Sequence, residues 1–334
     1  MLPRAHRRIG VIVKTLAVGL AATAFAGVLY EHVARRQDRK RFPQVGQSVD
    51  IGGRNLNIYC SGNGSPAVIL ESGKGIPGYS WVFVQREIAK FTRACWYDRS
   101  GYGWSDSGPY PQNSVETARE LHELLRRATI QPPYVLVGHS LGGFHVRVYN
   151  GLYPDDLAGM VLVDSSHEDE GIQIPRHRGR SHPAYLRRPV SLLAETVYGL
   201  GLLRVLARHR GSDFRPVGIT TGEWSIISGL ASEPRMMAAT AQECQGECGE
   251  QARSAGGLGD RPLIVLTAGK QTIRSPEDEE DRESWIRLQS QLVQLSSRGR
   301  QVVVRNSGHM IPYEVPEEII GAVREVITQA RNSR

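Results

Sequence analysis

The sequence predicts an α/β fold in which helices cover both faces of a mostly parallel sheet. Two observations support this prediction. Short uninterrupted apolar runs, such as residues 134–137 and 160–163, are typical of strands that are buried on both faces. These runs alternate with segments whose apolar residues recur at helical spacing, as in residues 116–128. With 334 residues, 40% of them hydrophobic, the chain can bury a sizeable core.

The N-terminal part of the chain is expected to lie in a membrane. Residues 9–30 are almost entirely apolar, and as a helix they would span roughly 33 Å, close to the hydrocarbon thickness of a bilayer. A basic tail (residues 1–8) precedes this anchor helix, and a basic linker (residues 31–46) follows it. The small residues around Ala26 resemble a signal-peptide cleavage site, so a secreted protein cleaved near Ala26 is the alternative.

The positive charge of the chain points to the same partner. The net charge is +7, and basic residues gather beside the apolar stretch and at residues 176–188. Because no nucleic-acid-binding motif accompanies them, phospholipid head groups are the expected partner and nucleic acid is not. Basic residues are similarly numerous before and after the apolar stretch, so the positive-inside rule does not assign the side of the membrane.

The first strands follow the linker. Apolar and polar residues alternate on both sides of Gly52-Gly53, which predicts an antiparallel hairpin over residues 47–60. Further strands are expected at residues 67–70 and 92–97, each followed by a glycine-rich loop. An amphipathic helix over residues 81–91 connects these two strands.

The alternation of strands and helices stops after residue 165. The segment 166–260 has no convincing central strand and instead predicts short helices at 190–207, 224–230 and 233–244, as in a helical cap. We therefore expect a cap at 166–260 inserted into a core formed by residues 47–165 and 261–330. Within the second part of the core, the expected elements are strands at 262–267 and 301–305, an acidic helix containing Trp285, and a helix at 316–330.

The four cysteines give limited information. Cys60 and Cys95 fall in predicted strands, where a small buried hydrophobic residue is the usual role. Cys244 and Cys248 are spaced for a local disulfide, if this part of the chain faces an oxidising compartment. They lack further ligands for a metal ion, so no metal site is expected.

A serine stands between the strand at 134–137 and the helix that follows it. The pattern Gly138-x-Ser140-x-Gly142 in this position is typical of a nucleophile elbow, in which a strained turn exposes the serine hydroxyl. Small residues at Gly138 and Gly142 would let the strand and helix approach closely. The N–H of Leu141, at the start of the helix, would form part of an oxyanion hole.

Three motifs in order resemble those of the α/β-hydrolase family. They are Gly-His-Ser-Leu-Gly-Gly at 138–143, Tyr-Asp-Arg-Ser-Gly-Tyr-Gly-Trp-Ser-Asp at 97–106 and Ser-Gly-His at 307–309. The resemblance extends over about residues 47–330. It implies an eight-stranded, mostly parallel sheet with an antiparallel first pair, a helical cap inserted after strand 6, and hydrolysis without a cofactor.

The general base is predicted to be His309. A serine hydroxyl needs a histidine to take its proton and an acid to orient that histidine. His309 follows the last strand, where the histidine of the family stands. His139 and His145 flank the elbow and are expected to pack or to point away from the nucleophile.

The sequence leaves the acid open. The resemblance places it after the seventh strand, but residues 268–272 contain no carboxylate. Asp164, at the end of the sixth strand, is the preferred candidate because a strand end holds a side chain firmly. Glu277 and Asp278 are the alternative acids. Against Asp164, an aspartate at a strand end can serve only to cap the next turn, and against the other two, a charge run such as 277–281 is usually a solvated helix start.

The resemblance also predicts the second donor of the oxyanion hole. By its match to the family's His-Gly-x pattern, the sequence Ser72-Gly73-Lys74 assigns this role to the backbone N–H of Lys74, beside that of Leu141. Ser72 in place of histidine departs from the pattern. The Lys74 side chain is not required and can be solvated.

These features predict a membrane-anchored serine hydrolase, similar to carboxylesterases and lipases, that cleaves a small-molecule ester through an acyl-enzyme. A serine nucleophile argues against the branches of the family that use aspartate. One alternative is a proline-iminopeptidase-like peptidase, in which Glu168, Asp169 and Glu170 would hold a substrate amine. The other is a non-catalytic binding protein with the same fold. The sequence does not determine the acyl group or the oligomeric state.

Overall fold

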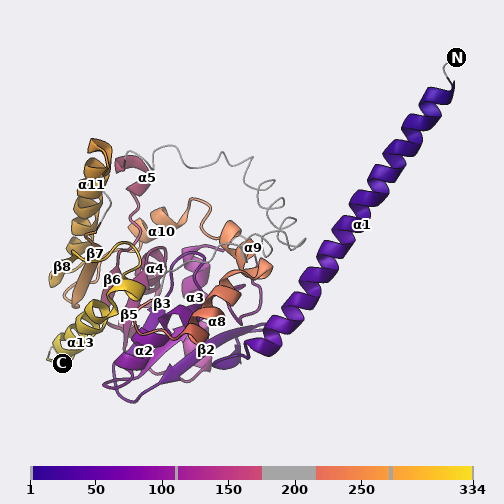
Figure 1. The fold of residues 1–334 in the computed structure, drawn as a ribbon. Helices are drawn as coiled ribbons and strands as arrows, with labels where there is room; N and C mark the ends of the chain where they lie inside the picture. Colours follow the sequence, from indigo (N-terminus) through magenta and orange to yellow (C-terminus); the bar gives the residue numbers. More distant parts are fainter. Residues whose placement is uncertain (1–2, 110–111, 175–215, 271–273, 333–334) are drawn as a thin grey trace.

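The predicted α/β architecture is confirmed in the computed structural model, which describes residues 3–109, 112–174, 216–270 and 274–332 (Figure 1). Its sheet has eight strands in the order β1-β2-β4-β3-β5-β6-β7-β8. Strand β2 runs antiparallel to both β1 and β4. All other neighbouring strands are parallel, so the sheet is mostly parallel, as expected.

The elements follow the predicted order. The strands are β1 (Gln47–Asp50), β2 (Asn55–Ser61), β3 (Ala67–Glu71), β4 (Ala94–Tyr97), β5 (Tyr134–His139), β6 (Leu157–Val163), β7 (Leu263–Ala268) and β8 (Gly299–Val304). The α-helices in the described residues are α1 (Pro3–Arg41), α2 (Val82–Ile88), α3 (Ser114–Arg127), α4 (Gly142–Leu152), α5 (Glu170–Gln173), α8 (Thr221–Ala231), α9 (Pro234–Gln242), α10 (Cys248–Ser254), α11 (Pro276–Leu292), α12 (Ile311–Glu314) and α13 (Pro316–Asn332).

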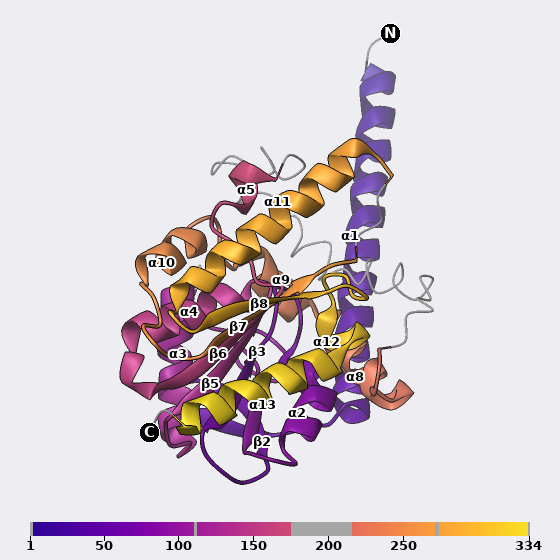
Figure 2. The same ribbon diagram turned by 90° about the vertical axis from the view of Figure 1, so that its left-hand side faces the viewer.

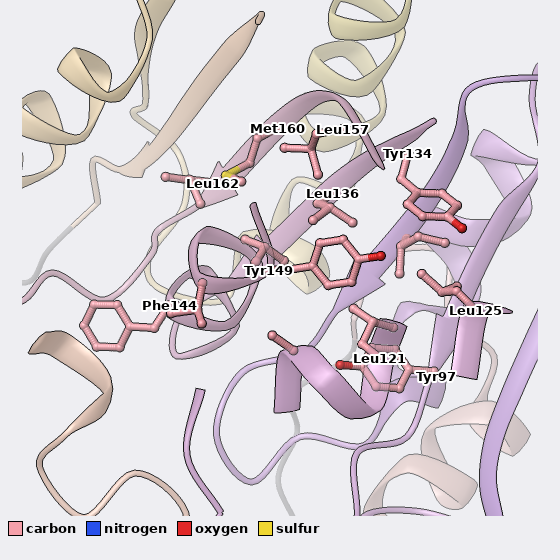
Figure 3. Packing of buried hydrophobic residues seen from close by; sticks show 14 of the residues in the cluster. Tyr97, Leu121, Leu125, Tyr134, Leu136, Phe144, Tyr149, Leu157, Met160 and Leu162 are labelled. Carbon is pink, nitrogen blue, oxygen red and sulfur yellow. The ribbon is translucent and has the colours of Figure 1, made fainter. Parts of the chain in front are cut away.

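The apolar strand residues are divided between two cores, one on each face of the sheet. Side chains alternate along a strand, so Leu136 faces the core beneath α3 and α4 whereas Val135 and Val137 face the core beneath α2 and α13. Figure 2 shows α13 lying across one face with α2 nearby, and Figure 3 shows Leu136 packed with Tyr149 of α4 on the other. This two-sided burial explains why the central strands are apolar without interruption.

The segment between β6 and β7 contains α5, α8, α9 and α10, and no strand among its described residues. This arrangement agrees with the helical character expected of the segment after the sixth strand. The expected helix at 190–207 lies outside the described residues. The boundaries of a cap at 166–260 remain a prediction.

Helix α1 projects from the rest of the molecule (Figure 1). It continues beyond residue 30 through most of the expected linker, to Arg41. Lys14–Ala34 is long and apolar enough to cross a membrane, and it carries exposed large apolar side chains such as Leu20 and Phe25. A signal sequence satisfies the same criteria. At the end of α1, the Phe42 ring lies against Gly229 of α8.

The expectation for Cys60 and Cys95 was wrong, because they form a disulfide. Both lie in strands, as predicted, but β2 and β4 pair with Cys60 directly opposite Cys95. The two strands are separated in the sequence by β3, so their pairing is decided only when the sheet assembles. The local disulfide between Cys244 and Cys248 is present.

Candidate active site

Ser140 lies at the apex of the turn between β5 and α4. Its φ is 54°, in the left-handed region that residues other than glycine seldom adopt, and its N–H donates to the Val163 carbonyl at 3.1 Å. A side chain at position 138 would place its Cβ 2.7 Å from Cγ2 of Val146, in α4. Gly138 therefore permits the close approach of strand and helix that holds Ser140 in this strained turn.

Gly142 has a different role from the one expected. A Cβ at this position would lie 2.7 Å from the Ser72 carbonyl oxygen, so Gly142 makes room for the loop after β3. A Cβ at Gly73 would lie 3.1 Å from the Ser140 Cβ. The loop that carries the predicted oxyanion donor is therefore packed directly against the elbow.

His309 is hydrogen bonded to Ser140 and to Asp164. Its Nε2 lies 3.0 Å from the Ser140 Oγ, and its Nδ1 lies 2.6 Å from the Asp164 Oδ2. The His309 side chain is half exposed, whereas the Asp164 side chain is buried. An unbroken hydrogen-bonded chain thus runs from an accessible hydroxyl, through an imidazole, to a buried carboxylate.

The second oxygen of Asp164 has its own partners. Oδ1 accepts hydrogen bonds from the Trp285 indole at 2.7 Å and from the Ala268 N–H at 2.8 Å. Ala268 ends β7 and Trp285 lies in α11, so two separate elements hold the carboxylate. With Oδ1 occupied in this way, Oδ2 is directed at the His309 ring.

The alternative acids lie elsewhere. Asp278 Oδ2 accepts from the backbone N–H groups of Arg274 and Ser275, and with Ser275 it forms a capping box at the start of α11. Glu277 is exposed in the first turn of the same helix. The carboxylate that contacts His309 is that of Asp164.

The two neighbouring histidines have opposite pKa shifts. Burial by itself would lower the pKa of His309, but the hydrogen bond and the charge of Asp164 outweigh it and raise this pKa above its usual value. Burial, and to a lesser extent the charge of His309, lowers the pKa of His139 to about 4. His139 Nε2 lies 2.9 Å from the His309 carbonyl oxygen. A neutral His139 can donate this bond and so support the His309 backbone.

Three other residues considered in the sequence lie around the elbow: His145, Lys74 and Leu141. His145 is buried, as expected of a packing residue, and its Nδ1 lies 2.9 Å from the Ser114 Oγ. The Lys74 ammonium donates to the Glu243 carbonyl oxygen at 2.7 Å and is thus tied to the segment between β6 and β7. Leu141 directly precedes α4, so its N–H belongs to the N-terminal turn of that helix.

Sequence reasoning missed three residues beside this site. Trp285 was assigned only to the apolar face of a helix, although its indole contacts Asp164. Arg99 is buried and bonded to the loop after β3. Its signal was a charged side chain in a glycine-rich loop directly after a strand. Glu243 is the buried partner of Arg99, and no local pattern indicated it.

A cavity of about 490 Å³ adjoins the elbow. Its lining includes Leu141, Phe144, His167, Glu170 and Cys248. Leu141 directly follows Ser140, so this cavity borders the turn that carries the serine, although neither Ser140 nor His309 lines it. In the described ranges of the chain, no group of three or more His, Cys, Asp or Glu side chains is arranged to hold a metal ion.

Two of the acids considered for amine binding are paired with arginine. Both guanidinium Nη atoms of Arg147 bond Glu168, at 2.7 and 3.0 Å, and the Asp169 carboxylate accepts from Arg253 at 2.6 Å. Burial would raise the pKa of Glu168, but Arg147 lowers it to about 2. These two carboxylates are therefore engaged within the protein.

Comparison with known proteins identifies the family. Residues 66–316 match the family model for the alpha/beta hydrolase fold. The chain belongs to the alpha/beta hydrolase family. An AB hydrolase superfamily protein of Gibberella zeae is 25% identical to this chain, over 80% of the chain and 87% of that protein. The uncharacterised protein YbdG of Bacillus subtilis is 24% identical over 46% of the chain, and the match spans 49% of YbdG.

Solved structures show the same fold. A thermophilic esterase from Thermogutta terrifontis superimposes with a TM-score of 0.59 over 86% of this chain and 99% of the esterase, at 21% identity. At that identity the likeness is one of fold. It agrees with the eight-stranded sheet and its flanking helices.

Proposed function

We propose that this alpha/beta hydrolase is a membrane-anchored serine hydrolase, of carboxylesterase or lipase type, that cleaves an acyl ester. The observation that carries the proposal is the position of His309, with Nε2 3.0 Å from the Ser140 hydroxyl and Nδ1 2.6 Å from Asp164. A hydroxyl, an imidazole and a carboxylate bonded in this order are the groups needed for acyl transfer through a covalent intermediate.

The proposed reaction has two stages. The Ser140 Oγ attacks the ester carbonyl while His309 Nε2 takes the hydroxyl proton, and the Asp164 carboxylate stabilises the imidazolium through Nδ1. The tetrahedral oxyanion is bound by the N–H groups of Leu141 and Lys74. Its collapse expels the alcohol, which receives the proton from His309. Water, deprotonated by His309, then hydrolyses the acyl-enzyme and restores the free serine.

Other observations support this proposal. The cavity beside Leu141 offers space for an acyl or alcohol group. A protein with the same fold, from Thermogutta terrifontis, is an esterase. The exposed apolar surface of α1 suits a membrane anchor, although a cleaved signal sequence is the alternative.

The proline-iminopeptidase-like alternative has less support. Such an enzyme needs carboxylates that can bind a substrate amine, and Glu168 and Asp169 already bind arginines. A preference for aminoacyl amides over esters in a substrate panel would favour this alternative.

The nucleophile can be tested with a fluorophosphonate probe. We expect the probe to label the wild-type protein and Ser228→Ala, which changes an exposed serine of α8, but not Ser140→Ala. Ser140→Ala should also abolish hydrolysis of p-nitrophenyl esters. If the folded wild type does not react while a control hydrolase does, the proposal is wrong and a non-catalytic binding role takes its place.

A further inference from the structure

Arg99 reaches the loop after β3 from a buried position in the loop after β4. Its side chain is only 4% exposed. One guanidinium nitrogen, Nη1, donates to the Ser72 carbonyl at 2.7 Å, and the other, Nη2, donates to the Gly73 carbonyl at 2.9 Å. The planar guanidinium thus holds two successive peptide groups of this loop.

This contact helps to set the direction of the Lys74 N–H, together with the Ile76 N–H, which donates to the same Gly73 carbonyl at 3.3 Å. The Gly73 carbonyl and the Lys74 N–H belong to one peptide group, and in a planar trans peptide they point in opposite directions. When Arg99 binds the carbonyl on one side, the N–H is presented on the other. Gly73 is in contact with Ser140, where a Cβ on Gly73 would lie 3.1 Å from the Ser140 Cβ. The orientation of this peptide therefore matters at the nucleophile.

Glu243 holds Arg99 from the other side. Its Oε1 accepts from the Arg99 Nε at 2.7 Å, and its Oε2 accepts from Nη2 at 3.4 Å and from the Tyr102 hydroxyl at 2.6 Å. The Tyr102 hydroxyl in turn accepts from the Gly75 N–H at 3.1 Å. The Lys74 ammonium also donates to the Glu243 backbone carbonyl. Glu243 is therefore linked to the loop at 72–75 in three ways: through Arg99, through Tyr102 and through Lys74.

The cluster is charged although it is buried. Arg99 lies between the carboxylates of Glu71 and Glu243, both of which are buried, and it stacks over the Tyr102 ring. Burial would raise the pKa of Glu243, but Arg99 and the nearby His145 lower it to about 2. A buried ion pair adds little net stability compared with apolar packing of the same volume. Stability alone therefore gives a weak reason for this arrangement.

We propose that Arg99 and Glu243 are positioning residues for the oxyanion hole: Arg99 orients the Gly73–Lys74 peptide, and Glu243 anchors Arg99 to the segment between β6 and β7. This inference rests on the proposed function, since it assigns the Lys74 N–H to the transition state. An oxyanion donor contributes to kcat and hardly to substrate binding. The expected signature is thus a loss of kcat with KM little changed.

The first test compares Arg99→Lys with a matched control. Lysine keeps the charge but cannot bind both carbonyl groups and Glu243 at once. We expect kcat for an activated ester to fall on the order of 10- to 100-fold, because losing a whole oxyanion donor costs about 100- to 1,000-fold. KM should stay within about 2-fold. Arg54→Lys, at another arginine paired with a buried glutamate, Glu120, should leave kcat unchanged.

A transition-state analogue separates positioning from general damage. A boronic acid forms a tetrahedral adduct with the serine and uses the oxyanion hole, so its inhibition constant should rise in parallel with the loss of kcat/KM in Arg99→Lys. Glu243→Gln keeps the side-chain shape and removes the charge. It should show the same two changes, a lower kcat and a higher inhibition constant, to a smaller extent. This second variant also serves if Arg99→Lys does not fold.

The outcomes distinguish this inference from the proposed function. If wild-type Ser140 does not react with a fluorophosphonate, the proposed function fails and the inference fails with it. If the wild type reacts but folded Arg99→Lys and Glu243→Gln keep full kcat, the inference alone is wrong. The inference is also wrong if kcat falls while the inhibition constant of the boronic acid stays unchanged, since the loss would then arise outside the oxyanion hole.

Discussion

At the scale of single residues, the acid shows where sequence patterns stop. Asp164 was the preferred candidate because it ends a strand, and the argument against it was that it could serve only to cap the next turn. In the structure Oδ1 accepts from Ala268 and Trp285, neither of which belongs to the turn after Asp164, while Oδ2 contacts His309. These partners lie 104 to 145 positions away in the chain. No local sequence window contains them.

Asp164→Asn is expected to lower kcat on the order of 1,000- to 10,000-fold, as loss of the orienting acid does in serine hydrolases. The reason is that an amide can no longer hold the His309 ring in the tautomer that accepts the serine proton. Steady-state kinetics with an activated ester measure this effect. Glu277→Gln is the control because Glu277 is exposed on α11, and it should stay near the wild type. Equal, small losses in both variants would show that Asp164 is not the acid.

The raised pKa of His309 predicts an acidic limb in the pH profile. Only neutral His309 can accept the serine proton, so kcat/KM should fall as the pH decreases through a midpoint above the usual value of about 6.5. The contribution of His309 to the stability of the fold changes with pH in the opposite direction. Protonated His309 favours the folded state at pH values below its unfolded-state pKa, and this contribution is lost as the pH rises through the folded-state pKa. A midpoint at or below 6.5 would contradict the expected shift.

At the scale of elements, the disulfide between Cys244 and Cys248 joins the end of α9 to the start of α10. Cys244 follows Glu243, its N–H donates to the Gln112 carbonyl at 2.9 Å, and its φ of 51° is unfavourable for a residue other than glycine. The disulfide thus helps to hold the backbone next to the carboxylate that binds Arg99.

Replacing both Cys244 and Cys248 by serine is expected to lower kcat several-fold, because Glu243 would be held less firmly. Stability should fall less than on loss of a disulfide that closes a longer loop, since Cys244 and Cys248 are only 4 positions apart. Kinetics and thermal unfolding measure the two effects separately. The control is the double variant Cys60→Ala with Cys95→Ala, which removes the β2–β4 disulfide. This control should lower the melting temperature and leave kcat near the wild-type value. The opposite pattern in the two double variants would contradict this role.

At the scale of the whole molecule, the membrane segment and the disulfides both bear on which side of the membrane the part that carries Ser140 faces. Basic residues on both sides of the apolar stretch leave its orientation open. Disulfides form and persist mainly in oxidising compartments. Both cysteine pairs lie after α1, in the part of the chain that carries Ser140.

The part of the chain after α1 is therefore expected on the oxidising side of the membrane. Alkylation of intact cells with a maleimide polymer before lysis should leave all four cysteines unmodified, and reduction first should expose them. Protease added to intact cells or sealed vesicles gives an independent measure of sidedness. Free thiols in unreduced protein, with digestion only after permeabilisation, would place this portion on the reducing side.

The sequence by itself determined the elements and the turn that carries Ser140. Period-two and helical patterns are local, so they predicted the strands, most helices and the Ser140 turn, and the position of His309 after the last strand followed from the family resemblance. Tertiary structure alone decided the Cys60–Cys95 pairing, the contact of Asp164 with His309, and the junction of Arg99 with Glu243 beside the elbow. These contacts join residues from separate elements, and their geometry depends on how the assembled sheet and the segment between β6 and β7 bring those elements together.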